Sequence, residues 1–296
     1  MEQNRSDWNG REPENSGLEA ESGRTSRKKK EKVKKTVGQE ILSWVMTILL
    51  AVVAALVIRS FIFEPVRVDG ESMLDTLQDG DIMFVSKWDY NSVWLSMPWQ
   101  DNVAKENAPR LASGFGTPQR YDVVVCRYPH RGDTNFVKRI VGLPGDTVEL
   151  KNGVLYVNGE KIPEEYINDG YRSGSLNELE RTYVPKKGDT VQIQDGKWVV
   201  NGEPMDGVDT VAAVNMISYG ATEADTCKSD WADFQEFVQA VNEGGVYTVK
   251  EDRYFVMGDH RDSSNDSRMQ GSIKRDMIIG KVRFVVWPLN TARGVR

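Results

Sequence analysis

The pattern of hydrophobic and polar positions divides the chain into three parts. Residues 1–36 contain almost no apolar residues, whereas Ile41 to Ile58 are 18 residues without a charge, a glycine or a proline. After Arg59, apolar residues recur in short runs that alternate with polar ones. Polar, charged segments of the first kind remain disordered, and alternation with a period of two is typical of half-buried strands. The pattern therefore predicts a disordered tail over 1–36, one long helix and a mainly β body.

The apolar run is long enough to cross a membrane. As a helix it rises about 27 Å, close to the thickness of the hydrocarbon core of a bilayer. We therefore predict a transmembrane anchor over residues 37–63, in which Phe61 and Phe63 extend the helix or lie at the interface. A cleaved signal peptide is the alternative, but its apolar region is usually shorter and its basic region lies near residue 1.

Charge is distributed unevenly along the chain. Residues 1–36 hold ten Lys or Arg and seven Asp or Glu, and eight of the basic residues fall between Arg24 and Lys35. Basic segments stay on the cytoplasmic side, so we expect a single-pass protein of the cell membrane with a cytoplasmic N-terminus and an extracellular body. The chain has a net charge of −6, which leaves −9 on the body. An acidic body argues against a nucleic-acid partner.

Cysteine and histidine are scarce. The chain has two of each, Cys126, Cys227, His130 and His260. These are too few for a disulfide scaffold or for a four-cysteine or histidine-rich metal site. We expect no metal and no cofactor, and the sequence leaves open whether the two cysteines pair.

Several segments of the body carry clear secondary-structure signals. Strands are predicted at Asp81–Ser86, Tyr121–Tyr128 and Ile278–Pro288, and one soluble helix over Ser229–Gly245. Residues 145–160 resemble residues 188–203, and each copy has an Asn-Gly or Asp-Gly turn between alternating runs, which predicts two β-hairpins. Residues 87–119 read as a long loop or small insertion. Its Trp88, Trp94 and Trp99 either lie on the membrane or pack in the core.

Two stretches together indicate nucleophilic chemistry. Ser72 lies in the turn-rich run Val68–Leu77, and Lys138 lies in the apolar run that begins at Phe136. A serine needs a base to become a nucleophile, and a lysine is such a base when burial lowers its pKa from about 10.4. If the run is a strand, Lys138 and Arg139 point to opposite faces, one toward the interior and the other toward solvent or a carboxylate. The alternative is an ordinary surface lysine.

A third stretch, Met257–Arg268, is rich in Asp, Ser and Arg. Asp262, Ser264 and Asp266 alternate as in a calcium loop, but the sixth and twelfth positions are Ser267 and Ile273 instead of Gly and Glu. We therefore reject a calcium site. Hydroxyls and paired Asp and Arg residues are better suited to fixing a buried lysine.

These stretches resemble the conserved boxes of a known enzyme family. The matching residues are Asp69-Gly-Glu-Ser-Met, Arg120-Tyr-Asp-Val-Val-Val, Val137-Lys-Arg-Ile-Val-Gly-Leu-Pro-Gly-Asp and Gly258-Asp-His-Arg-Asp-Ser-Ser-Asn-Asp-Ser-Arg. They are similar to those of bacterial type I signal peptidases, membrane-anchored serine–lysine endopeptidases. Their order and spacing fit from the anchor to the end of the chain. A single anchor resembles the forms common in Gram-positive bacteria.

The resemblance implies roles for particular residues. Ser72 matches the nucleophile and Lys138 the general base, while Ser264 matches a serine that hydrogen-bonds the lysine. Asp266 and Arg268 match a bracing ion pair. The oxyanion hole of the family uses the backbone N–H of the nucleophile. Some members add a hydroxyl two residues earlier, where this chain has Gly70. We expect shallow apolar pockets, lined by Val68, Met73, Leu77 and Phe136, that admit only small side chains at positions −1 and −3 of the substrate.

Two residues depart from the family pattern. Asp75 stands where the family usually has proline, and His260 stands where it has asparagine. A carboxylate near the nucleophile is expected to raise the pKa of Lys138 by favouring its charged form.

The sequence thus predicts a mainly β protein with one transmembrane helix. A coiled antiparallel catalytic sheet is expected from residues 64–150 and 251–296, and a β-rich inserted subdomain from residues 151–250. The predicted activity is removal of signal peptides from exported precursors, with those precursors and the lipid bilayer as partners. A self-cleaving repressor-type serine–lysine protease would instead carry a DNA-binding domain and no anchor. An inactive anchored binding module would not need Ser72 and Lys138.

Overall fold

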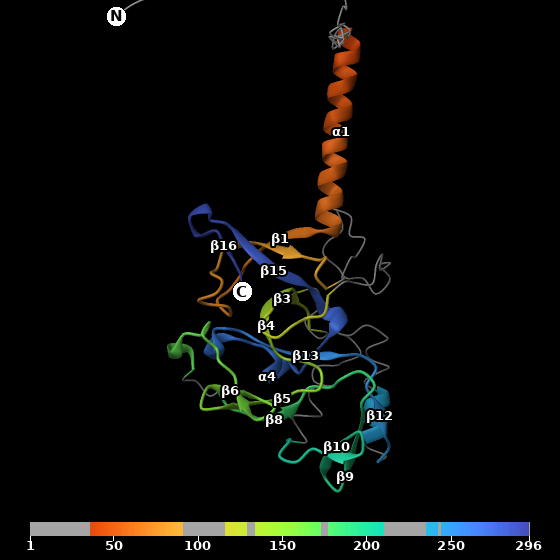
Figure 1. Cartoon of the computed structure of the whole chain (residues 1–296), viewed down its shortest axis with the longest axis vertical. Coiled ribbons are helices and arrows are strands. Elements are labelled where there is room, and N and C mark those ends of the chain that lie inside the picture. The colour runs from red at the N-terminus through yellow and green to blue at the C-terminus, as the bar shows by residue number, and fades with distance from the viewer. Residues whose placement is uncertain are drawn as a thin grey trace, which may run out of the picture. The chain divides into compact units, whose positions relative to one another are not determined.

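The computed structural model describes residues 36–90, 116–128, 134–172, 177–209, 235–241 and 244–295. The apolar run forms helix α1 (Val37–Phe61), the long orange helix of Figure 1. Its segment Val37–Ile58 is the one described helix that is long and apolar enough to cross a membrane, and its side chains are exposed. An apolar surface on all sides of a helix suits lipid. The helix ends at Phe61, so Phe63 belongs to the strand that follows.

The largest sheet is antiparallel and combines strands from both halves of the chain. Its strands are β1 (Phe63–Arg67), β2 (Ile82–Ser86), β3 (Val123–Cys126), β4 (Phe136–Gly142), β13 (Arg253–Met257), β14 (Ile273–Lys274), β15 (Ile278–Trp287) and β16 (Arg293–Gly294). The order is β1-β2-β15-β3-β4-β13-β14, and β16 pairs with β15. The register shifts in β15 and β13 mark bulges, and bulges bend and twist a sheet. This sheet is the predicted curled antiparallel sheet.

The internal repeat forms two smaller sheets of the same design. The first contains β5 (Thr147–Lys151), β6 (Val154–Val157), β7 (Glu160–Lys161) and β8 (Leu179–Tyr183), and the second contains β9 (Thr190–Gln194), β10 (Lys197–Val200), β11 (Glu203–Pro204) and β12 (Tyr247–Thr248). Their orders are β7-β6-β5-β8 and β11-β10-β9-β12. The two labelled groups are green to cyan in Figure 1, apart from the blue β12. Both hairpin predictions are confirmed.

The repeated Asn and Asp residues make the same hydrogen bonds in both copies. Asn158 accepts from the backbone N–H of Thr147 (2.8 Å) and donates to Asp146 (2.8 Å). Asn201 accepts from the backbone N–H of Thr190 (2.9 Å) and donates to Asp189 (3.0 Å). The repeat therefore encodes a local brace across each hairpin.

Short helices complete the described residues. They are η2 (Asp169–Tyr171), η4 (Arg261–Ser263), α4 (Ser267–Gln270), η5 (Arg275–Met277) and η6 (Leu289–Thr291). Within the predicted helix Ser229–Gly245, residues 235–241 are helical, and Phe237 is buried against Trp198 and Tyr247. The described residues do not include Trp94, Trp99, His130, Cys227, Trp231 or the tail 1–35.

Mainly β architecture with one N-terminal apolar helix is thus confirmed. The largest sheet uses residues 63–142 and 253–294, and the smaller sheets use residues 147–248. These limits lie close to the predicted boundaries at 150 and 251. The division into a catalytic part and an inserted subdomain stays a prediction.

Candidate active site

Ser72 lies on the loop that connects β1 to β2. The base of this loop is closed by backbone hydrogen bonds from Val68 N–H to Asp81 (2.8 Å) and from Gly80 N–H to Val68 (3.0 Å). Gly70 has a φ of +105°, which L side chains rarely adopt. Buried Met73 and Leu77 anchor the loop in the core. The loop thereby presents Ser72 at a fixed, partly exposed position.

Lys138 projects from β4, between β3 and β13 in the largest sheet. Its side chain is only 2% exposed, which excludes an ordinary surface lysine. The amine Nζ donates to Ser72 Oγ at 2.8 Å and to the carbonyl of Val137 at 3.0 Å. The fold thus joins a serine and a lysine that are 66 residues apart in sequence.

Burial lowers the pKa of Lys138 from its ordinary 10.5, because a cation loses its hydration in an apolar site. Asp266, Cys126 and Asp259 oppose this effect and raise the pKa, but the net direction is down. Asp75 is not among these leading contributors, contrary to the expectation from sequence. The environment therefore increases the fraction of neutral amine, the form that can take a proton.

Asp266 and Arg268 form a bidentate ion pair beside the lysine. Arg268 Nε lies 2.8 Å from Asp266 Oδ1, and Arg268 Nη2 lies 2.8 Å from Asp266 Oδ2. Burial raises the pKa of Asp266, but the bonds and charge of Arg268 and the N–H of Gly258 bring the net pKa below 3.8. Asp266 also caps α4. The carboxylate therefore stays ionised and holds the last box in place.

Ser264 is buried next to the same groups. Its hydroxyl makes no hydrogen bond of regular geometry among the described residues, although it lies close enough to Asp266 to lower the pKa of that carboxyl. Lys138 Nζ is therefore not bonded to Ser264 in this structure. A Cβ on Gly258 would lie 2.2 Å from Ser264 Oγ and 2.5 Å from the carbonyl oxygen of Ser72. Only glycine allows these segments to approach so closely.

A second buried ion pair, between Arg139 and Asp259, was not predicted from the sequence. Arg139 is 1% exposed, and its Nε and Nη2 donate to Asp259 at 2.9 and 2.7 Å. Thr76, on the loop that carries Ser72, also hydrogen-bonds Asp259. Arg139 was expected to face either solvent or a carboxylate, and it faces a carboxylate. The pair therefore joins β4, the loop that carries Ser72 and the segment Met257–Arg268.

The predicted pocket residues differ in exposure. Val68, Met73 and Leu77 are at most 5% exposed and pack in one core cluster, so only their edges can meet a substrate. Phe136 is partly exposed, and Lys138 Nζ lies 5.8 Å from the centre of its ring. The role of these four residues in recognising substrate stays a prediction.

The two unusual residues share a neighbour. Asp75 accepts from Asn168 Nδ2 at 3.2 Å and from the hydroxyl of Tyr171 at 3.4 Å. The ring of His260 lies 4.0 Å from the ring of Tyr171. No local sequence signal near residues 168–171 indicated this contact.

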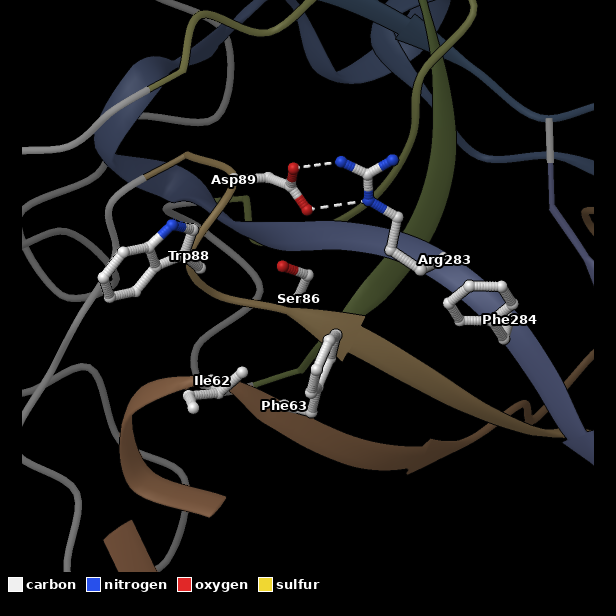
Figure 2. A pocket seen from close by; sticks show the side chains of 7 residues that line it. All are labelled: Ile62, Phe63, Ser86, Trp88, Asp89, Arg283 and Phe284. Carbon is white, nitrogen blue, oxygen red and sulfur yellow. Dashed lines mark hydrogen bonds and ion pairs between the residues drawn. The ribbon is translucent and has the colours of Figure 1, made fainter. Parts of the chain in front are cut away.

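A separate cavity of about 500 Å³ lies at the start of β1. Figure 2 shows its walls, the apolar side chains of Ile62, Phe63, Trp88 and Phe284 beside the ion pair of Asp89 and Arg283. Neither Ser72 nor Lys138 lines it.

Cys126 is a fully buried free thiol, and burial raises its pKa to about 12.

The chain that carries this hydrogen-bonded serine and lysine is similar to known proteins over most of its length. The family model "Signal peptidase, peptidase S26" matches residues 41–187 and 184–287. The chain belongs to the signal peptidase family. The predicted family, enzyme class and activity, removal of signal peptides from secreted precursors, are thereby confirmed.

Two signal peptidases and one solved structure are similar to this chain. Signal peptidase I S of Bacillus subtilis is 30% identical over 86% of this chain and 94% of its own length. Signal peptidase I of Pseudomonas aeruginosa is 30% identical over 78% of this chain and 67% of its own length. The crystal structure of a signal peptidase I from Enterococcus faecalis is 25% identical, covers 57% of this chain and 99% of that chain, and has a TM-score of 0.29.

Proposed function

We propose that Ser72 is the nucleophile of this signal peptidase and that Lys138 is its general base. The observation that carries this proposal is the 2.8 Å hydrogen bond between Lys138 Nζ and Ser72 Oγ, made by a buried lysine whose pKa is lowered. The neutral amine removes the proton of the hydroxyl, and Ser72 Oγ attacks the carbonyl carbon of the scissile bond. The proton on Lys138 then passes to the leaving amine, and water releases the acyl group by the reverse sequence.

The backbone N–H of Ser72 is proposed as the oxyanion donor. It makes no hydrogen bond with the described residues and so is free to donate to the developing negative charge. Gly70 offers no side-chain hydroxyl for this purpose. The oxyanion hole therefore depends on how firmly the backbone at Ser72 is held.

The bracing roles are assigned to Asp266, Arg268 and Ser264. Arg139 pairs with Asp259 and Arg268 pairs with Asp266, and the two arginines reduce the pull of these carboxylates on the proton of Lys138. Val68, Met73, Leu77 and Phe136 are proposed to bound the sites for small residues at −1 and −3 of the substrate. A crowded, buried lining of this kind disfavours large side chains.

Membrane association is proposed to have a defined orientation, with residues 1–36 in the cytoplasm and the β body outside. The basic run before α1 supports it. An apolar strip, defined as Phe63, Phe84, Phe284 and Trp287, supports contact of the body with lipid. Phe84 on β2 lies opposite Phe284 on β15. The ring centres of Phe84 and Phe63 are 6.2 Å apart. Phe284 and Trp287 are about half exposed.

The test of the proposed nucleophile is processing of a secretory precursor in detergent by the full chain. Ser72→Ala should abolish cleavage because, among the described residues, no other hydroxyl is bonded to Lys138. Ser263→Ala, an exposed serine of the last box, is the matched control and should cleave at the wild-type rate. Normal cleavage by a folded Ser72→Ala variant contradicts the assignment.

A further inference from the structure

Residues 164–172, called the strap, contact the catalytic elements from outside the largest sheet. The base of the strap is fixed by a buried ion pair between Glu164 and Arg261, both at most 1% exposed at the side chain. Arg172 closes the strap by donating to the carbonyl of Glu164 at 3.2 Å and to that of Gly153 at 3.3 Å. Tyr166 lies over Arg139, with 3.9 Å between its ring centre and the guanidinium carbon. The strap is therefore joined to the strand of Lys138 and to the last box.

The tip of the strap reaches the nucleophile loop through Tyr171. Its hydroxyl donates to Asp75, which also accepts from Asn168. Its ring lies against the ring of His260 at 4.0 Å with 36° between the planes. Tyr171 thereby touches the loop directly on one side of Ser72 and reaches the other side through His260.

His260 binds the backbone on both sides of the nucleophile. Its own backbone N–H donates to the carbonyl of Ser72 at 3.1 Å, and its ring Nδ1 lies 3.1 Å from the carbonyl oxygen of Glu71. A carbonyl oxygen only accepts, so Nδ1 carries the proton and donates. Glu71 is exposed and follows Gly70, so this flank of the loop has little packing of its own.

The bond to Glu71 has a chemical consequence because a peptide unit is planar. The carbonyl of Glu71 and the N–H of Ser72 belong to the same peptide unit and point in opposite directions. A donor that fixes this carbonyl also fixes the direction of the N–H. The hydrogen bond to the Glu71 carbonyl also polarises the peptide unit, which makes the N–H of Ser72 a stronger donor.

We propose that His260 is a positioning residue for the oxyanion donor, and that Tyr171 holds the His260 ring in the orientation that this requires. The inference rests on the proposed roles of Ser72 and its backbone N–H. His260 does not touch the substrate. It aims the N–H of Ser72 at the position that the oxyanion occupies, and the strap supplies the surface against which the imidazole is fixed.

The experiment compares four variants of the full chain in detergent with a signal-peptide substrate. His260→Ala removes the donor and should lower kcat roughly 10- to 100-fold with KM unchanged, since oxyanion stabilisation acts in the transition state. His260→Asn should restore most of kcat, because an amide nitrogen can donate from nearly the position of Nδ1. Tyr171→Ala should lower kcat, while Tyr171→Phe should retain most activity because it keeps the ring contact.

A peptide aldehyde provides a second readout that a purely structural role would not move in this way. Ser72 Oγ adds to the aldehyde carbon, its proton passes to Lys138, and the former carbonyl oxygen becomes the oxyanion. His260→Ala should therefore weaken aldehyde inhibition by about the factor lost in kcat. Binding of the corresponding non-cleavable amide peptide should not change. Tyr156→Ala, a partly exposed tyrosine on β6, is the matched control and should match wild type in all three measurements.

The outcomes separate this inference from the proposed function. Ser72→Ala is run in the same assay, and activity in that variant contradicts the nucleophile assignment itself. If Ser72→Ala is inactive but His260→Ala keeps the wild-type kcat, or loses kcat without weaker aldehyde inhibition, the positioning role is wrong. Rates are referred to folded protein by circular dichroism. If His260→Ala does not fold, Tyr171→Ala, at a partly exposed residue, decides by the same comparison.

Discussion

At the scale of single residues, the chemistry depends on a lysine that is expensive to bury. Lys138 is almost fully buried, and burial lowers its pKa from the ordinary 10.5. The unfolded chain therefore binds more protons than the folded one between the lowered pKa and 10.5, so stability rises with pH in that window. At a pH below the lowered pKa, the folded protein bears the full free-energy cost of burying the lysine cation. Above pH 10.5 that cost is absent. The same shift that destabilises the fold makes the amine a base.

Replacing the lysine by an apolar residue of similar length should reveal this penalty. We expect Lys138→Met to fold and to have a thermal midpoint at or above that of wild type at neutral pH, because a buried cation is removed. The difference should shrink as pH rises toward 10.5. Thermal unfolding followed by circular dichroism across that range measures it, and Lys151→Met, an exposed lysine of β5, is the control. A lower midpoint for Lys138→Met at neutral pH would contradict the account.

The pairing of Ser72 with Lys138 could be predicted from sequence because three stretches together resemble the boxes of one family, although neither residue is distinctive alone. The apolar neighbours of Lys138 indicated burial, and the strand geometry indicated that Arg139 points the other way. Burial of Arg139 as well could not be foreseen, because it follows from β4 lying between β3 and β13 with both faces covered. Its partner Asp259 is 120 residues away. The contacts of Asp75 and His260 with Tyr171 are tertiary and leave no local signal.

At the scale of elements, buried ion pairs join segments that the sheet alone would leave separate. The Arg139–Asp259 pair links β4 to the segment that follows β13, and Thr76 adds the nucleophile loop. The hairpins of the repeat were predictable because their turns and their Asn and Asp braces are local. The position of β15 between β2 and β3 could not be predicted, since pairing between strands that are distant in sequence depends on the whole fold.

Removing one partner of the buried pair should be costly. Asp259→Ala leaves the guanidinium of Arg139 buried without its carboxylate, and the expected loss is about 3–5 kcal/mol of unfolding free energy. The double variant Arg139→Met with Asp259→Ala should recover part of it. Glu236→Ala, which removes the partner of exposed Lys250, is the control and should change stability little. Denaturant unfolding measures these values, and equal effects of Asp259→Ala and Glu236→Ala would refute the role of the pair.

At the scale of the whole molecule, the proposed orientation places the active site outside the membrane. A precursor emerging from the membrane presents its cleavage site at the outer surface, so a body anchored there by α1 meets it. The helix and its basic flank were predictable because length and charge are properties of composition. The apolar strip on the sheet was not, because Phe63, Phe84 and Phe284 become neighbours only when β1, β2 and β15 pair.

Protease added outside intact cells should digest the β body and spare residues 1–36. Antibodies against the tail and the body would follow the fragments on blots, and detergent lysis is the control that exposes both. A body that is protected until lysis would contradict the orientation.

Lipid contact by the strip predicts a substrate-dependent defect. Phe284→Glu should slow cleavage of a precursor embedded in vesicles more than cleavage of a soluble peptide in detergent, because a charge opposes contact with the bilayer. Val246→Glu, at an exposed valine that directly precedes β12, should slow neither. Equal rates for Phe284→Glu and wild type on vesicles would remove the support for lipid contact.

The central claim, that Lys138 activates Ser72, is tested most directly by the rate of precursor cleavage with Lys138→Ala and Lys138→Arg against wild type. All three proteins are checked for folding by circular dichroism. The wild-type rate should rise with pH through the lowered pKa of Lys138. Lys138→Ala should lose several orders of magnitude, as loss of an activating base does elsewhere, and Lys138→Arg should be nearly as inactive, because a guanidinium does not deprotonate. A well-folded Lys138→Ala protein that cleaves near the wild-type rate would contradict the serine–lysine assignment.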